Sequence, residues 1–360
     1  MNNRMHQSVI TWLLIVCGLI VTMVVFGGYV RLTRSGLSIV EWNVVDGVLP
    51  PIGEAAWQTT FAQYQQTPEF QKVNSAMTLA EYRRIFYIEY IHRLLARIAG
   101  LVVILPLVAF VVKGIIPWGR SAVYWLIALL FVFQGFLGWY MVSSGLVDSP
   151  SVSPYRLTIH LLMALLVLGL TFWVALDRVY PAALRRPARG AGWAMALLVL
   201  VGVQIAYGGL VAGMKAGHLS DTFPRMFGYL VPPGLFAVLQ PWWANLVADP
   251  TAVHFIHRWF AFVVLSGALV LLGLVSRADA PREVRWGGLL LGLLVSVQVG
   301  LGLSVIWLHV PLTLALLHQL TAVLLFLNIL FLLHRLRAGA VRVASAQPEP
   351  MSALHPQPGR

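Results

Sequence analysis

Long apolar runs separated by shorter polar segments dominate the sequence. Eight runs of about 20 residues or more carry few charged positions, and each is long enough to cross a bilayer as a helix. None of them shows the strict alternation of a strand, so we predict an all-α polytopic membrane protein. The predicted spans are 9–30, 86–112, 121–143, 156–177, 191–213, 252–275, 286–308 and 311–334.

Composition and charge agree with this class. Of the 360 residues, 59% are hydrophobic and only 11% are charged, whereas soluble domains carry about 25% charged residues. The net charge of +12 could attract nucleic acid, but its distribution argues against that partner. The segments on the N-terminal side of the spans hold fourteen basic and four acidic residues. This bias is the positive-inside rule, so it predicts that both termini are cytoplasmic.

The two halves of the chain carry the same features in the same order. Glu89–Tyr90–Ile91–His92–Arg93 returns about 165 residues later as His254–Phe255–Ile256–His257–Arg258. The first and fifth runs each carry a glycine pair near their ends, and the third and seventh each carry a glutamine followed by glycines. Because four spans return the chain to its starting side, we predict two parallel-repeat four-helix bundles.

This repeat suggests boundaries for the parts of the chain. We expect an N-terminal bundle at 1–178, which includes a long outer loop at 31–85, and a C-terminal bundle at 191–337. Residues 179–190 would form an inner linker. Residues 338–360 are rich in alanine, proline and glutamine, which is typical of a disordered tail.

The long outer loop contains two helix-start signals. Thr67 followed by Pro68 is typical of a first helical turn. Thr78 and Glu81 have the spacing of a capping box. We therefore expect the second span to begin near Thr78, outside the membrane, and to continue into it without a break.

Four histidines lie at matching depths in the predicted spans. The second, fourth, sixth and eighth spans all enter from the outer side, and each has one histidine within about two turns of its start. These residues are His92, His160, His257 and His318. Imidazoles from neighbouring helices can ligate a haem iron from both faces, so we predict one haem per half in the outer part of the membrane. The alternative is that they are polar residues that hold helices together.

Three arginines accompany these histidines. Arg93 and Arg258 directly follow His92 and His257, and Arg97 lies one turn beyond Arg93 on the same helix face. Guanidinium groups bind carboxylates well, so we expect contacts with haem propionates near the outer surface. The alternative is that these side chains reach membrane lipid headgroups.

One carboxylate distinguishes the first half from the second. In register, Glu89 corresponds to His254, and it shares a helix face with His92 three residues later. A carboxylate in a membrane span is costly unless it is paired or has a function. We predict that Glu89 is a catalytic group beside the first haem; a salt bridge to Arg93 is the alternative. The role of His254 stays open.

These residues resemble the haem A synthase family over about 9–335. The features that carry the resemblance are Glu89-x-x-His92-Arg93, Thr33–Arg34–Ser35–Gly36–Leu37–Ser38, His160, His257–Arg258 and His318. The long first loop and the single Cys17 resemble the proteobacterial and mitochondrial branch, which lacks a loop cysteine pair. Ala96 is a departure, because the family more often has glycine before the arginine at Arg97.

The resemblance implies a reaction and a division of roles. Haem O would be oxidised at a ring methyl group to give the formyl group of haem A, in a bacterial inner membrane. His257 and His318 would ligate a resident haem b, while His92 and His160 would flank the substrate haem beside a catalytic Glu89. A haem O synthase and cytochrome oxidase assembly factors are implied partners. The electron acceptor, the source of the inserted oxygen and a homo-oligomeric state are left open.

Two functions from other classes compete with this enzyme. A non-catalytic dihaem b-type electron-transfer protein predicts symmetric haem sites or sites on opposite membrane sides, but Glu89 breaks the symmetry and all four histidines lie on one side. A haem transporter or chaperone requires a polar path to the inner side, and the inner halves of the spans carry no such chain of residues.

Overall fold

The computed structural model shows an all-helical protein. It describes residues 3–41, 46–147, 149–180, 190–277 and 280–337. These residues form helices and loops without a named strand, and eight of the helices are long and apolar enough to cross a membrane. The chain is therefore a multi-pass membrane protein, as predicted. The eight helices are α1 (Asn3–Leu32), α4 (Leu79–Val112), α5 (Ala122–Ser143), α6 (Pro154–Val179), α7 (Ala191–Gly213), α9 (Pro250–Val275), α10 (Arg282–Trp307) and α11 (Leu312–Leu336).

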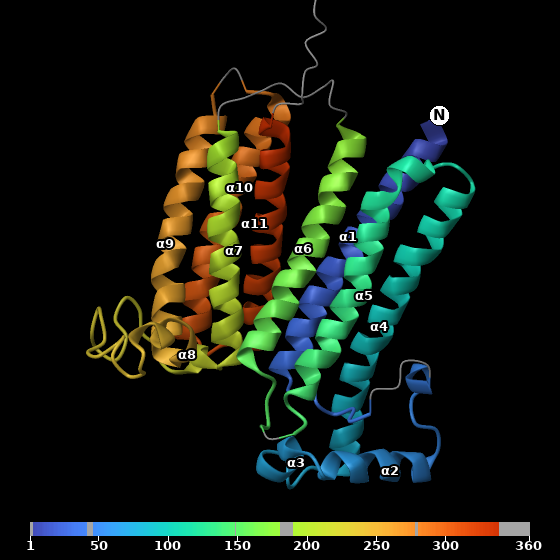
Figure 1. Ribbon diagram of the computed structural model, residues 1–360. Helices are drawn as coiled ribbons and strands as arrows, with labels where there is room; N and C mark the ends of the chain where they lie inside the picture. Colours follow the sequence, from blue (N-terminus) through green and yellow to red (C-terminus); the bar gives the residue numbers. More distant parts are fainter. Residues whose placement is uncertain (1–2, 42–45, 148, 181–189, 278–279, 338–360) are drawn as a thin grey trace, which may run out of the picture.

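The long helices pack as two sets of four. In the first set α1 contacts α4 and α6, and α5 contacts the same two helices; in the second, α7 and α10 each contact α9 and α11. The sets meet where α6 contacts α7 and where α11 contacts α1 and α6, and Figure 1 shows them side by side. Each set has its own apolar core, with Leu107 and Leu168 fully buried in the first and Leu271 and Ile329 fully buried in the second. Most of the predicted linker, 181–189, and the predicted tail, 338–360, lie outside the described residues.

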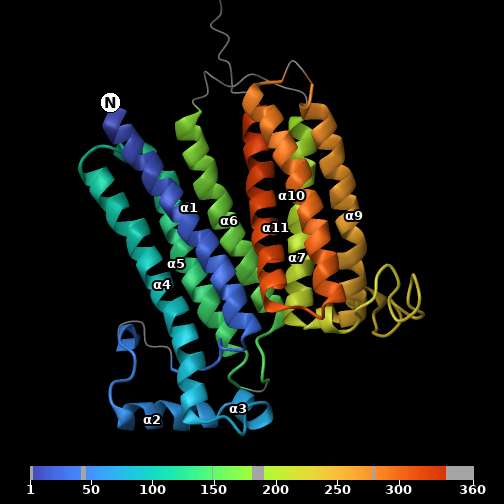
Figure 2. The same ribbon diagram turned by 180° about the vertical axis from the view of Figure 1, so that it is seen from behind.

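The two long connections lie at the same end of the molecule. The connection between α1 and α4 carries α2 (Glu54–Gln65) and α3 (Pro68–Lys72), and the one between α7 and α9 carries α8 (Asn245–Ala248). Figures 1 and 2 place all three short helices at the end opposite to the N-terminus. The sequence did not predict α2, because its apolar residues are few and have no clear period.

Both helix-start signals of the first connection are confirmed. Thr67 is the N-cap of α3, and its hydroxyl accepts a hydrogen bond from the backbone N–H of Phe70. Thr78 and Glu81 form the predicted capping box at the start of α4, in which the Glu81 carboxylate accepts from the Thr78 N–H at 2.8 Å. Helix α4 therefore projects beyond the membrane span as one continuous helix of 34 residues.

Aromatic side chains fix the first connection on α4. The Trp57 ring meets the Phe86 ring edge-on with 5.0 Å between centroids, and Tyr64 stacks on Tyr82 at 5.1 Å. All four side chains are buried, and burial of this much aromatic surface contributes several kcal/mol. The Tyr82 hydroxyl also donates to the Ser38 carbonyl at 3.2 Å, so the segment that follows α1 is held against α4.

A buried carboxylate lies in this first connection, outside the spans. Glu69 is only 4% exposed, and it accepts a hydrogen bond from the Tyr64 hydroxyl at 3.3 Å. Burial is the main cause that raises the pKa of Glu69 to about 7, and the negative charge of Glu89 acts in the same direction. The Tyr64 hydrogen bond and the positive charges of Arg34 and Lys215 oppose the shift.

This carboxyl group predicts a pH-dependent stability. The pKa of Glu69 in the folded state is above its ordinary value of 4.5, so the native chain holds more protons than the unfolded chain between about pH 4.5 and 7. The free energy of unfolding therefore falls as the pH rises through this window. The Glu69→Gln variant lacks this titrating group. We therefore expect its free energy of unfolding to fall between pH 5.5 and 8 by on the order of 1–3 kcal/mol less than that of the wild type, as measured by thermal unfolding in detergent.

The matched control is Glu54→Gln in the same connection, because the Glu54 side chain is 62% exposed and pairs with Arg83. This variant should keep the pH slope of the wild type. Equal slopes for Glu69→Gln and the wild type would contradict the assignment.

Candidate functional site

The structure brings the four predicted histidines together in two pairs. All four are half-buried. His160, His257 and His318 lie about two turns from the starts of α6, α9 and α11, and His92 lies further along α4, whose first turns project beyond the span. His92 of α4 and His160 of α6 belong to the first set of helices. The rings of His257 and His318, from the second set, have centroids 6.5 Å apart and planes inclined by 79°.

Each imidazole lies against a glycine of a neighbouring helix. A Cβ atom built on any of these glycines would lie 3.1–3.3 Å from the nearest ring atom, which is too close for comfortable packing. The pairs are Gly27 with His92, Gly138 with His160, Gly208 with His257 and Gly302 with His318. The glycines of the repeated sequence features thus leave room for the imidazole edges. The next glycine in α1, Gly28, allows Gln319 of α11 to approach, and so joins the two sets.

Glutamine amides contact three of the four histidines. Gln134 and Gln204 donate to the backbone carbonyls of His160 and His257, each at 3.0 Å. The amide nitrogen of Gln204 also lies 3.2 Å from Nδ1 of His257. In α10, Gln298 lies 3.3 Å from Nε2 of His318. Each glutamine precedes its glycine by four residues, so this spacing was visible in the sequence, although its connection to the histidines was not.

The imidazole pair of His257 and His318 fits a haem iron held between two histidines. Two metal–nitrogen bonds of about 2 Å each, together with the ring radii, require roughly 6 Å between ring centres. The separation of His257 and His318 agrees with this value. Within the described part of the chain, Nδ1 of His160 and of His318 are buried without a hydrogen-bond partner, which is costly for a group with no ligand. No cluster of three or more ligating side chains occurs among the described residues, so the donors present suit a porphyrin-held metal better than a metal bound by protein alone.

Glu89 and Arg93 of α4 form hydrogen bonds with the segment that follows α1, and we call this arrangement a clamp. One carboxylate oxygen accepts from Nε and Nη2 of Arg93, at 2.9 and 2.5 Å. The other accepts from the Ser38 hydroxyl at 2.8 Å and from the Ile39 N–H at 2.9 Å. Arg93 also donates to the Ile39 carbonyl at 3.0 Å. Glu89 is 3% exposed, so the alternative role that the sequence left open, a salt bridge to Arg93, is present in the structure.

A second clamp has the same plan in the other set of helices. Arg258 donates from Nε to Nε2 of His254 at 3.0 Å. Its two terminal nitrogens donate to the carbonyls of Thr222 and Ser220, at 2.7 and 2.6 Å. His254 and Arg258 are both buried. The two clamps differ in the acceptor for the arginine, which is a carboxylate in the first and an imidazole in the second. Only the carboxylate also accepts hydrogen bonds from the segment that follows α1.

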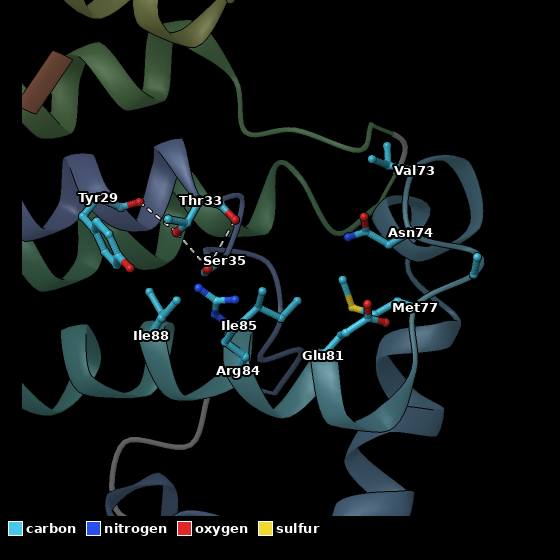
Figure 3. Close-up of a pocket in the computed structure, with 11 residues that line it drawn as sticks. Tyr29, Thr33, Ser35, Val73, Asn74, Met77, Glu81, Arg84, Ile85 and Ile88 are labelled. Carbon is cyan, nitrogen blue, oxygen red and sulfur yellow. Dashed lines mark hydrogen bonds between the residues drawn. The ribbon is translucent and has the colours of Figure 1, made fainter. Parts of the chain in front are cut away.

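The predicted propionate contacts of the arginines stay predictions. Arg93 and Arg258 already donate to backbone carbonyls of the long connections. Arg97 lies one turn further into the membrane on α4 and is half-buried. Two pockets, of about 510 and 420 Å³, lie at the end with the long connections. None of the four histidines lines either pocket. The larger is shown in Figure 3.

Fold and site define a multi-pass helical membrane protein with two pairs of imidazoles suited to haem. Comparison with known proteins agrees. Residues 10–330 match the COX15-CtaA family, described as cytochrome oxidase assembly protein. The chain is 42% identical over 337 residues to the haem A synthase of Nitrosospira multiformis, with 92% of this chain and 94% of the relative covered. It is 41% identical to that of Nitrosomonas eutropha and 42% identical to that of Paramagnetospirillum magneticum, again over more than nine-tenths of each chain. The chain belongs to the haem A synthase family.

The glycine contacts predict a specific loss of haem. A side chain at Gly208 would displace the His257 ring, so we expect Gly208→Val to lose most of the haem that copurifies with the wild type. Gly202→Val is the matched control on the same helix, because a Cβ at Gly202 meets nothing within 4 Å. Haem is measured from the absorbance spectrum per mole of purified protein. Equal haem loss in both variants would contradict a role for the contact between Gly208 and His257.

Proposed function

We propose that this chain converts haem O to haem A by oxidising one ring methyl group to a formyl group. Relatives named haem A synthase, about 42% identical over most of the chain, support this activity. The two imidazole pairs provide places for a substrate haem and for a second haem. The observation that carries the assignment of roles is the difference between the clamps, in which Glu89 replaces the imidazole of His254.

The first set of helices holds the substrate in this proposal. His92 and His160 flank haem O, and the second pair, His257 and His318, ligates a resident haem b. When bound, that haem supplies electron transfer. The neighbouring glycines let the imidazoles pack against the facing helices and so fix their orientation. Arg93, Arg97 and Arg258 remain candidates for contacts with propionates.

Glu89 is the catalytic carboxylate in this proposal. All four groups that surround it donate hydrogen bonds, and an ionised carboxylate accepts such bonds best. The carboxylate is therefore held in place near His92, which follows three residues later on α4. A fixed negative charge at this place stabilises positive charge that develops at the ring methyl group during its oxidation.

We further propose a parallel repeat with both termini in the cytoplasm of a bacterial cell. The contacts among α1, α4, α5 and α6 have the same pattern as those among α7, α9, α10 and α11, which supports a repeat of four helices each. The excess of basic residues on the N-terminal side supports an inner-membrane protein with its haem sites in the periplasmic half. A haem O synthase and cytochrome oxidase assembly factors are the expected partners, in line with the description of the family.

The second clamp supplies the substitution that tests Glu89. Glu89→His copies the pair of His254 and Arg258, in which an imidazole accepts from the arginine and the loop remains held. We expect the variant to fold and to keep its resident haem while haem A formation falls by about 100-fold or more, because the fixed negative charge is lost. Haem A and its hydroxylated precursor are measured by extraction from cells that supply haem O.

The outcomes of this test distinguish a failure of the proposed activity from a failure of the role assigned to Glu89. A wild-type chain that binds haem O but forms no haem A would contradict the proposed function. A Glu89→His variant that forms haem A at the wild-type rate would show that Glu89 serves only to hold the loop. The reciprocal variant, His254→Glu, is the control, and it should retain haem A formation.

A further inference from the structure

The larger pocket opens at the end of the first helix set, beside the end of α1 and the start of α4 (Figure 3). Its volume is about 510 Å³, and its walls combine hydroxyl groups, apolar side chains and one arginine, Arg84. In Figure 3 the Arg84 guanidinium points from α4 into the space below Ser35, and the Tyr29 hydroxyl points into the same space from α1. Ile88 lies between them, and Ile85 lines the pocket on the other side of Arg84.

Arg84 is exposed, and no residue that the structure describes pairs with its charge. Its neighbour Arg83 pairs with Glu54 and lies over the Trp57 ring, at 5.2 Å from the centroid. Glu81, the acidic residue of the pocket wall, accepts from the N–H and hydroxyl of Thr78 in the capping box. Among the residues that the structure describes, Arg84 has no ion-pair or hydrogen-bond partner. Its five N–H donors remain available to a ligand.

The pocket lies next to the His92 site. The Phe26 ring stacks on the His92 ring with 5.9 Å between centroids, and on the Tyr29 ring with 5.8 Å. Tyr29 in turn lines the pocket. Along α4, Arg84, Ile88 and His92 follow one another at intervals of four residues, so they lie close to one face of the helix. A flat apolar ligand at His92 would therefore extend toward Arg84 along Ile88 and Tyr29.

We propose that Arg84, with the Tyr29 hydroxyl, binds a propionate carboxylate of the substrate haem. This inference rests on the proposed function, because it takes haem O as the ligand of the first helix set. A haem is an apolar ring with two carboxylates on one edge, and the pocket offers apolar walls with an unpaired guanidinium fork at its polar end. Arg93, one of the arginines considered above for propionate contacts, already donates to Glu89 and to the Ile39 carbonyl.

The second helix set has no arginine at the position that corresponds to Arg84. This fits a role of Arg84 in binding the substrate haem alone. The residue that corresponds to Arg84 in the register of His92 and His257 is Asp249. Asp249 is the N-cap of α9 and accepts from the N–H groups of Thr251 and Ala252. A resident haem needs no separate capture site, whereas a substrate must be recognised on every turnover.

The test compares haem O with its dimethyl ester, in which both propionates have lost their charge. The purified protein, with its resident haem, is titrated in a phosphate-free, nonionic detergent and followed by absorbance. We expect Arg84→Gln to weaken haem O binding about tenfold or more, because a charge-assisted hydrogen bond is lost. The dimethyl ester should bind the wild type and Arg84→Gln equally. Arg83→Gln is the matched control, and it should bind haem O as the wild type does.

Turnover provides a second readout. With Arg84→Gln we expect a higher haem O concentration for half-maximal haem A formation, with the maximal rate unchanged, because the residue binds the substrate without acting at the methyl group. Wild-type affinity of Arg84→Gln for haem O would overturn the inference, as would an equal loss of affinity for the ester. An effect seen only in vesicles of anionic phospholipid would also overturn it, because the ligand would then be a lipid phosphate. A wild type that binds haem O without forming haem A would instead contradict the proposed function and leave the Arg84 inference standing.

Discussion

Polar side chains inside a membrane bundle need room and partners, and this requirement governs both halves of the structure. Four imidazoles enter the bundles, and each approaches a neighbouring helix at a glycine, where an added Cβ would lie only 3.1–3.3 Å from the ring. Glutamine amides on three of those helices then hold the backbone or ring of the histidine. A polar group that is expensive in lipid becomes tolerable when its contacts are built into the helix that faces it.

The arginine clamps connect these buried sites to the long connections. Arg93 and Arg258 each follow a histidine in sequence. Each donates hydrogen bonds to backbone carbonyls in the long connection of its own helix set. The common scaffold explains why the His–Arg dipeptide occurs twice. It also sets apart the residues at the equivalent positions, a carboxylate at Glu89 and an imidazole at His254. This difference is the basis on which we propose different roles for the two helix sets.

Local patterns made much of the fold predictable. The eight spans and the capping box at Thr78 follow from run length and spacing, which need no knowledge of the tertiary fold. Contacts between distant segments were different. Arg83 and Arg84 are adjacent and chemically identical, and only the fold shows that one is paired with Glu54 while the other faces a pocket. In the same way, the burial of Glu69 depends on how the first connection folds over α4, which no local pattern specifies.

The central claim is that the two histidine pairs have different tasks, and haem content tests it most directly. The four alanine variants of His92, His160, His257 and His318 are purified, and the haem b that remains per chain is measured from the pyridine haemochrome spectrum. We predict that the variants of His257 and His318 lose the resident haem, while those of His92 and His160 keep it. Retention of haem b by the His257→Ala variant, or loss of haem b from all four variants alike, would contradict the account.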